Sequence, residues 1–318
     1  MASGLTLVTG ASGFAGSHLI DRLRGRVRLA AWHRPASPAR PGADDLAWEG
    51  VDLLDRDAVE RAIRRRRPAR IYHLAGAAQV HSSWRTVVPH LQGNVLGTHH
   101  LLEAVRRAGH RCRILVVTSA QVYRARADRP IGEDEPFGPA NPYGVSKLAQ
   151  DELARRAADD DGLDVVIARP FNHAGPRQTD AFALASFARQ IATAEAAGLP
   201  AEVRVGNLDV RRDIIDVRDV VSAYERVMEH APTGRAYNVA SGRAERVGDL
   251  LDVMIGLART PVHVVRDADR FRPADVPIIT GDASRLRTEL GWSPVVPMAT
   301  TIADTLEWWR SAVVPKHA

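Results

Sequence analysis

Tyr143 and Lys147 lie four residues apart in the stretch Tyr-Gly-Val-Ser-Lys and could act together in proton transfer. The chain contains 43 lysines and arginines, of which only Lys147 and Lys316 are lysines, so Lys147 calls for a reason specific to an ammonium group. On a helix the two side chains would share a face. The cation would then favour the phenolate, and its compact donors suit ribose hydroxyls. On spacing alone, an ordinary surface pair is the alternative.

A glycine-rich stretch near the N-terminus predicts a phosphate-binding loop. Its spacing is G-x-x-G-x-x-G, and it lies between a strand-like segment and a helix-like one. Glycines there allow a tight turn and close approach of a pyrophosphate to the helix N-terminus. A purely structural turn is the alternative, and the strand and helix on either side disfavour it. The cofactor contacts expected from the loop are Gly10, Ser12, Gly13, Phe14, Ala15 and Gly16.

The residue at the end of the second predicted strand favours NADP(H) over NAD(H). An NAD site usually offers Asp or Glu there to bind the ribose 2′-hydroxyl, whereas arginine suits a 2′-phosphate. This strand ends in Trp32, His33 and Arg34 and offers no carboxylate. Arginine is abundant in the chain, so a solvated Arg34 is the alternative.

The elements that must hold these residues follow an α/β pattern. Short apolar runs alternate with longer amphipathic stretches, which is typical of a parallel sheet with crossover helices. The second half is less regular and predicts a smaller lobe built largely from the C-terminal third. Predicted strands are 5–9, 27–31, 70–74, 114–118, 165–169, 212–217 and 235–239, predicted helices include 55–66, 88–108 and 142–158, and predicted loops are 36–45 and 124–142.

Composition limits the class of protein. A chain of 318 residues with 45% hydrophobic and 25% charged residues can bury a sizeable core, and no apolar run of 18 residues predicts a membrane span. Cys112 is the only cysteine, which excludes an intrachain disulfide and favours the cytoplasm. The net charge of +5 raises the question of nucleic acid. The densest basic run, 64–67, follows acidic residues at helical spacing and is better explained as a helix end, so no nucleic-acid partner is expected.

Several blocks along nearly the whole chain resemble the extended short-chain dehydrogenase/reductases, the NAD-dependent epimerase/dehydratase family. Beside the glycine loop and the Tyr-Lys pair, the matching blocks are Asp52-Leu53, Leu74-Ala75-Gly76, Asn94, Ser119-Ala120-Gln121-Val122-Tyr123, the stretch from Arg169 to Pro176, Val205-Gly206-Asn207-Leu208, Arg212-Asp213, Arg272-Pro273-Ala274-Asp275-Val276-Pro277 and Gly291-Trp292. The resemblance implies a Rossmann-type, doubly wound parallel sheet with a smaller mixed α/β C-terminal substrate lobe. We expect residues 1–171, with about 212–239, to form the NADP-binding domain, and 172–211 with 240–318 to form the lobe.

Within that family, the second half of the chain is most similar to enzymes of GDP-6-deoxymannose metabolism. These are the GDP-mannose 4,6-dehydratases and the GDP-4-keto-6-deoxymannose reductases. Dehydratases carry an acidic residue after the fifth strand to remove the C5 proton, and this chain has Gln121 there, which cannot be a carboxylate base. The resemblance therefore implies NADPH-dependent reduction of a C4 ketone, such as conversion of GDP-4-keto-6-deoxy-D-mannose to a GDP-6-deoxyhexose like GDP-D-rhamnose.

The resemblance also implies roles for individual residues. Tyr143 would donate the proton, Lys147 would bind the nicotinamide ribose and bias Tyr143 toward ionisation, and Ser119 would bind the substrate oxygen. Further cofactor contacts would be Asp52, Leu53, Leu74, Ala75, Gly76, Thr118, Pro170, Asn172 and His173, and substrate contacts would be Gln121, Asn172, Gln190, Arg212, Arg272 and Asp275. Related dehydratases have lysine at position 190, which puts the role of Gln190 in doubt. No metal is expected, and helices 88–108 and 142–158 could pair across a homodimer.

Three alternatives stay open. A nucleotide-sugar 4-epimerase would use the same Tyr, Lys and glycine loop but usually binds NAD tightly, for which an acidic residue at the end of the second strand is expected. A 4,6-dehydratase would need a base where Gln121 stands. A non-catalytic dinucleotide sensor typically lacks the Tyr or the Lys, and both are intact here.

Overall fold

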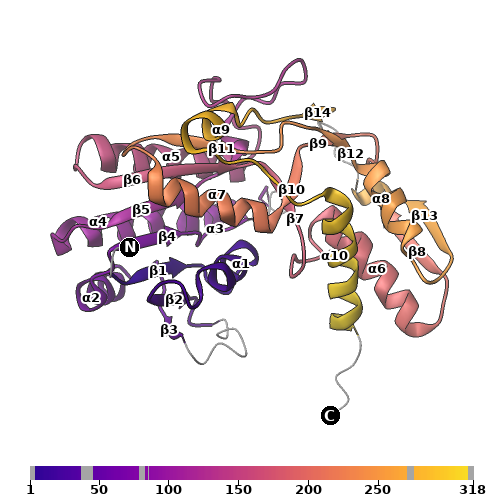
Figure 1. The fold of residues 1–318 in the computed structure, drawn as a ribbon, viewed down its shortest axis with the longest axis horizontal. Helices are drawn as coiled ribbons and strands as arrows, with labels where there is room; N and C mark the ends of the chain where they lie inside the picture. Colours follow the sequence, from indigo (N-terminus) through magenta and orange to yellow (C-terminus); the bar gives the residue numbers. More distant parts are fainter. Residues whose placement is uncertain (1–3, 37–45, 79–82, 85, 271–275, 314–318) are drawn as a thin grey trace, which may run out of the picture.

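A seven-stranded, wholly parallel sheet forms the centre of the molecule in the computed structural model, which describes residues 4–36, 46–78, 83–84, 86–270 and 276–313 (Figure 1). Its strand order is β11-β6-β5-β4-β1-β2-β3. The strands are β1 (Thr6–Thr9), β2 (Leu29–His33), β3 (Ala47–Gly50), β4 (Arg70–His73), β5 (Arg113–Val117), β6 (Asp164–Pro170) and β11 (Ala236–Val239). The α/β, Rossmann-type fold expected from the sequence is confirmed.

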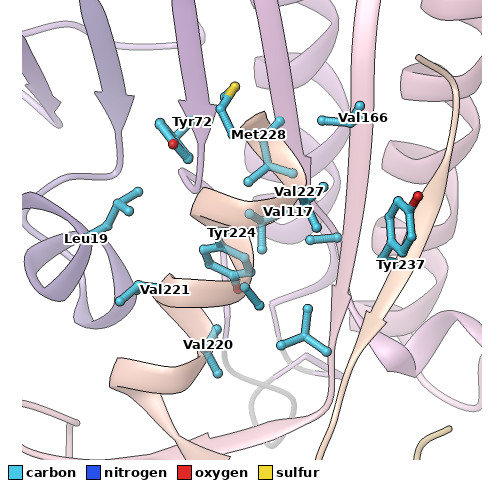
Figure 2. Close-up of a cluster of buried hydrophobic side chains, with 14 of the residues drawn as sticks. Leu19, Tyr72, Val117, Val166, Val220, Val221, Tyr224, Val227, Met228 and Tyr237 are labelled. Atoms are coloured by element: carbon cyan, nitrogen blue, oxygen red, sulfur yellow. The ribbon is translucent and has the colours of Figure 1, made fainter. Parts of the chain in front are cut away.

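The central strands are apolar throughout because both faces of the sheet are covered. Successive side chains point to opposite faces, so Leu7 packs under α2 (Arg56–Arg66), α4 (Gly97–Ala108) and α5 (Pro142–Asp159). Val8 packs with α1 (Phe14–Leu23), α7 (Val217–His230) and α9 (Ser284–Leu290). Figure 2 shows this second cluster, in which Val227 of α7 lies beside the sheet.

The helices begin where their sequences provide caps. The Asp55 carboxylate accepts a hydrogen bond from the backbone of Ala58 and starts α2. The Asn141 amide oxygen does the same for Gly144, with Pro142 at the first position of α5. These side chains satisfy backbone N–H groups that have no partner within the helix. The start of α5 matters most, because it sets the position of Tyr143.

A smaller lobe lies beside the sheet, at the right of Figure 1. Its core joins α6 (Ala183–Ala197), α8 (Val247–Gly256) and α10 (Met298–Val313) to β8 (Ala201–Val205), which pairs with β13 (Val262–Arg266). The remaining elements are β7 (Asn172–Ala174) paired with β10 (Ile214–Asp216), the sheet of β12 (Glu245–Arg246), β9 (Arg211–Arg212) and β14 (Ile278–Ile279), α3 (Val87–Leu91), a π-helical segment (Gln92–Leu96), and 3₁₀ turns at Ala120–Val122 and Ala268–Arg270.

Two predicted elements differ in the structure. The helix expected over 88–108 is α3, the π-helical segment and α4 in succession, and the wider turn falls next to Gly93, where a side chain would approach the backbone of Ala77. The strand expected over 212–217 is divided between β9 and β10, since Asp213 turns its carboxylate to Ser241 and Gly281. Segment 283–292, assigned to the lobe from the sequence, packs in the same cluster as α7 and β11.

Within the described ranges, no helix is both long and apolar enough to cross a membrane. The same residues contain no group of three or more His, Cys, Asp and Glu side chains arranged to hold a metal ion. Cys112 is a free, buried thiol.

Candidate active site

The glycine loop forms a tight cradle against the carboxyl ends of β1 and β4. Gly10 has a φ of +67°, a left-handed conformation that glycine adopts without steric cost, and a Cβ there would lie 2.7 Å from the nitrogen of Ala75. A Cβ on Gly16 would lie 2.2 Å from the oxygen of Gly10. A side chain at either position would collide with neighbouring backbone, so the tight turn of the loop depends on glycine.

The N-terminus of α1 is open to an anion. Gly13 is the residue before the helix and provides no side-chain cap, and the first turn holds no acidic residue. The first N–H groups of this helix lack intrahelical partners and carry its positive dipole end. Ser12 and Gly13 are exposed, whereas Phe14 and Ala15 are half-buried. The loop thus fits a dinucleotide, as its sequence predicts.

The chain after β6 returns to the same loop. The ring of His173 stacks on that of Phe14 with centroids 5.6 Å apart, and burial lowers the pKa of His173. Pro170 is buried at the end of β6 and Asn172 is exposed at the start of β7. The structure therefore gathers three predicted contacts from distant sequence at one edge of the sheet.

Arg34 and Asp52 border the other side of the loop. The backbone nitrogen of Ala11 donates to the oxygen of Trp32, which holds the glycine loop against the end of β2. Arg34, two residues further, is exposed. The Asp52 carboxylate accepts from the backbone of Leu54, and the Leu53 oxygen faces the His100 ring nitrogen at 2.8 Å. These positions suit an adenosine ribose, with Arg34 free to approach a 2′-phosphate.

Leu74, Ala75 and Gly76 follow β4 and lead toward Lys147. The Ala75 nitrogen donates to the Thr9 hydroxyl, and Gly76 has a φ of +151°. A Cβ on Gly76 would lie 2.2 Å from Asn94 Oδ1 and 3.8 Å from Lys147 Nζ. The glycine keeps this approach to the ammonium open.

Tyr143 and Ser119 meet at the start of α5. Burial raises the pKa of Tyr143, and its hydrogen bond with Ser119 opposes that rise. Burial therefore outweighs the other effects on this phenol, and the expectation that Lys147 biases Tyr143 toward ionisation stays a prediction. The ammonium lies 6.0 Å from the ring centroid, and removal of the phenol from water has the larger effect. Tyr143 is held as a protonated phenol, the form that a proton donor requires.

Lys147 is buried beneath Tyr143 and directed to two oxygen acceptors. Its Nζ donates to Val117 O at 3.0 Å and to Gln150 Oε1 at 2.8 Å. Burial lowers the pKa of Lys147 to about 7. Tyr143 and Lys147 do lie on one face of a helix, as the spacing predicts.

Gln121 supports the helix that carries Tyr143. Its Oε1 accepts from Asn141 Nδ2 at 3.1 Å, and Asn141 in turn caps α5 through Gly144. A Cβ on Gly144 would lie 2.5 Å from Gln121 O, so only glycine fits this contact. The residue is an amide that joins two loops, and it provides no carboxylate beside Ser119.

Thr118 faces the interior. Its hydroxyl donates to Asp151 Oδ2 at 3.0 Å, and Arg169 clamps the same carboxylate at 2.7 and 2.8 Å. Any contact of Thr118 with a cofactor would have to use its backbone. The buried Asp151–Arg169 pair ties α5 to β6.

The predicted substrate residues are only partly gathered. Arg212 donates to Val276 O at 2.8 Å, so β9 and the segment before β14 lie together. The Gln190 side chain accepts from Arg204 N at 2.8 Å and donates to Arg204 O at 3.4 Å, so both ends of its amide are bound to β8. Arg272 and Asp275 lie outside the described residues.

Sequence reasoning did not identify His90, Thr98 and Gln150 as members of the site. The edge of the His90 ring contacts the Tyr143 ring with centroids 6.0 Å apart. Gln150 bonds both Lys147 and Thr98. A polar residue three positions after Lys147, on the same buried face, was the only available signal for Gln150.

Comparisons with known proteins agree with this geometry. A family model described as GDP-mannose 4,6 dehydratase matches residues 7–305. The chain is 36% identical to GDP-6-deoxy-D-mannose reductase of Pseudomonas aeruginosa, over 96% of this chain and 97% of that protein. It is 31% identical to UDP-glucose 4-epimerase of Mycolicibacterium smegmatis, over 96% and 98%.

A solved structure, RMD from Pseudomonas aeruginosa complexed with NADPH, superposes with a TM-score of 0.84 at 35% identity, covering 98% of this chain and 100% of that one. The match therefore extends over both the sheet domain and the smaller lobe. The chain belongs to the GDP-mannose 4,6-dehydratase family of extended short-chain dehydrogenase/reductases.

Proposed function

We propose that the protein reduces the C4 ketone of a nucleotide-linked 4-keto-6-deoxy sugar with NADPH. The substrate we favour is GDP-4-keto-6-deoxy-D-mannose, with a GDP-6-deoxyhexose such as GDP-D-rhamnose as product. The observation that carries this proposal is a protonated, buried Tyr143 beside Ser119, with an amide rather than a carboxylate at Gln121. The similarity to the Pseudomonas aeruginosa reductase supports the same choice.

Tyr143 and Ser119 would handle the ketone oxygen. The Ser119 hydroxyl, at the N-cap of a 3₁₀ turn, can donate to that oxygen and favour the charge that develops on it. Tyr143 then gives its proton to the nascent alkoxide. Lys147, a cation on the same helical face, would stabilise the phenolate that remains.

The residues fit NADPH, which when bound supplies the hydride. The glycine cradle and the uncapped start of α1 would hold the pyrophosphate. Arg34 would bind the 2′-phosphate, and the remaining N–H of Lys147 would bind the nicotinamide ribose. Phe14 and His173, stacked at 5.6 Å, would close the site over the cofactor.

The smaller lobe would hold the nucleotide of the substrate. Arg212, fixed by Val276 O, would bind the diphosphate, with Asn172 as a neutral donor. Arg272 and Asp275 stay predictions from the sequence for the diphosphate and the nucleoside. Gln190 would act indirectly by holding β8. We retain the domain division expected from the sequence, with 283–292 moved to the sheet domain on the basis of its packing.

The test is NADPH oxidation, followed at 340 nm, with GDP-4-keto-6-deoxymannose. Tyr143→Phe should lower kcat by about 10²–10⁴-fold, because it removes the general acid. The matched control is Tyr72→Phe on β4, in the core cluster packed against α1, α7 and α9, which should retain activity. No NADPH oxidation with any nucleotide-linked ketosugar would overturn the proposal.

A 4-epimerase is the second candidate, and the similarity to UDP-glucose 4-epimerases favours it. It would retain its cofactor through the cycle. Protein that purifies with bound NAD and interconverts a UDP-hexose without added cofactor would replace the reductase proposal. Conversion of GDP-mannose to its 4-keto-6-deoxy product would instead indicate a dehydratase, for which Gln121 provides no base.

We also propose a homodimer formed through the outer faces of α3 and α5. Large apolar side chains are exposed there, including Trp84 at 70%, Val88 at 61% and Val145 at 48%. Trp84 and Val145 also line a groove of about 310 Å³, together with Val87, Leu91 and the segment from Pro139 to Pro142. A second copy would cover this face. Val88→Glu should convert the dimer to a monomer in light scattering, whereas an unchanged mass would refute this interface.

We place the protein in the cytoplasm. Cys112 is a free, buried thiol, and an unpaired cysteine suits a reducing compartment. Localisation of a fluorescent fusion tests this directly.

A further inference from the structure

Lys147 belongs to a buried chain of hydrogen bonds that crosses from α5 to β1. Gln150 Oε1 accepts from Lys147, and Gln150 Nε2 donates to Thr98 Oγ1 at 2.8 Å. His73 Nε2 lies 2.9 Å from the same hydroxyl, and His73 Nδ1 lies 2.8 Å from Thr9 Oγ1. All five side chains are buried.

The number of protons available on each group fixes which atom donates and which accepts in every hydrogen bond of this chain. Thr98 has one hydroxyl proton, which it donates to Asn94 O at 2.7 Å. It must therefore accept from both of its other neighbours, so His73 carries its proton on Nε2 and Gln150 turns its NH₂ group to Thr98. The Gln150 carbonyl oxygen consequently faces Lys147. Because His73 is neutral and an amide does not pass on protons, the chain is an anchor rather than a proton relay.

We propose that Gln150 is a positioning residue for Lys147. Its amide oxygen, fixed by Thr98 and His73, orients the ammonium and keeps it charged. An ammonium has three N–H donors, and Val117 and Gln150 take two of them. One donor is left for a ribose hydroxyl, on the side that Gly76 leaves open.

The surroundings of the ammonium make this amide oxygen important. Burial lowers the pKa of Lys147 to about 7, so the loss of one acceptor would neutralise it near physiological pH. The titratable groups that face it are Tyr143, one turn earlier in α5, and His73 on β4, whose pKa burial and the ammonium lower to about 3. Asp151, one turn later, is paired with Arg169 of β6. His90 of α3 contacts the Tyr143 ring, and the contacts from α4 and β5 are the neutral Thr98 and the backbone of Val117.

The scarcity of lysine allows a direct test. Lysine labelled with ¹³C at Cε gives two signals in this chain, from Lys147 and Lys316, and Lys316→Arg assigns them. Titration of the Lys147 signal in the protein without substrate measures its pKa. Gln150→Met keeps the length of the side chain but removes the acceptor, and should lower that pKa by about one unit, or about 1.4 kcal/mol. Gln150→Glu places a carboxylate there and should raise it by about one unit.

Two controls separate positioning from general structural damage. Gln92→Leu removes an exposed glutamine of the adjacent π-helical segment and should leave the Lys147 titration unchanged. Thr98→Val removes the hydroxyl that accepts from Gln150 Nε2, and it should lower the pKa of Lys147 by less than Gln150→Met does. Equal titration of Lys147 in Gln150→Met, Gln150→Glu and the wild type would overturn the proposal, and so would shifts of the same sign in both variants.

The kinetic consequence alone rests on the proposed function. The alkaline limb of the pH profile of kcat for ketone reduction should move to lower pH in Gln150→Met and to higher pH in Gln150→Glu. Each shift should equal the change in the pKa of Lys147 measured by titration. A shifted titration with no ketosugar reduction would reject the reductase function and retain the positioning role. An unchanged titration with normal ketosugar reduction would reject the positioning role of Gln150 and retain the reductase function.

Discussion

Asp151→Asn should destabilise the protein far more than its single-atom change suggests. The Asp151 and Arg169 side chains are both 0% exposed, and the guanidinium binds the carboxylate with two hydrogen bonds of 2.7 and 2.8 Å. The amide removes the negative charge and leaves Arg169 as a buried cation. Its other hydrogen-bond acceptors, the Tyr123 hydroxyl and the Glu133 backbone oxygen, are neutral. Loss of one partner of a buried ion pair typically costs about 3–5 kcal/mol.

The magnitude is best judged against an exposed pair at the C-terminal end of the same helix. Arg156 and Asp160 are 72% and 59% exposed, so Asp160→Asn should change the free energy of unfolding by less than about 1 kcal/mol. The measurement is chemical denaturation of both variants under identical conditions, supported by thermal melting. At about 2–4 °C per kcal/mol, Asp151→Asn should lower the melting temperature by roughly 10 °C.

A third variant tests the physical cause. Asp151→Leu combined with Arg169→Met removes both charges, so it should recover part of the loss because no unpaired charge stays in the core. The reasoning is refuted if Asp151→Asn and Asp160→Asn have equal unfolding free energies. It is also refuted if the double variant is less stable than Asp151→Asn.

Two further outcomes follow from the cradle and from the buried histidines. Gly16→Ala should weaken NADPH binding at least about tenfold in a fluorescence titration, because its Cβ would lie 2.2 Å from Gly10 O, whereas Gly256→Ala meets no atom within 4 Å and should bind normally. Burial lowers the pKa of His18 to about 4 and that of His73 to about 3. The unfolded chain therefore binds more protons below pH 6.5, and the free energy of unfolding should fall as the pH drops from 6.5 to 4.5. A flat profile over that range in denaturation experiments would contradict neutral, buried histidines.

The parts of the site that are local in sequence could be predicted. The glycine loop and the facing of Tyr143 and Lys147 depend on spacing within a few residues. The parallel sheet was predictable for a similar reason, because strands buried on both faces read as continuous apolar runs.

The protonation of the site was not predictable from the sequence. Whether Tyr143 has a raised or a lowered pKa depends on the balance between burial and a cation, and burial is a property of the folded structure. The direction of Gln150 depends on Thr98 and His73, which come from other elements of the chain. Likewise, the split between β9 and β10 depends on Asp213 meeting Gly281, 68 residues later.

The position of β11 at the edge of the sheet has a consequence during synthesis on the ribosome. β11 pairs with β6, and residues 171–235 separate the two strands along the chain. At about 5–20 residues per second, the nascent chain carries β6 without that neighbour for several seconds. Val165, Val166 and Ile167 are fully buried in the finished sheet, so this edge is apolar and open to pairing with other chains in the meantime. Newly made protein should depend on chaperones more than refolded protein does.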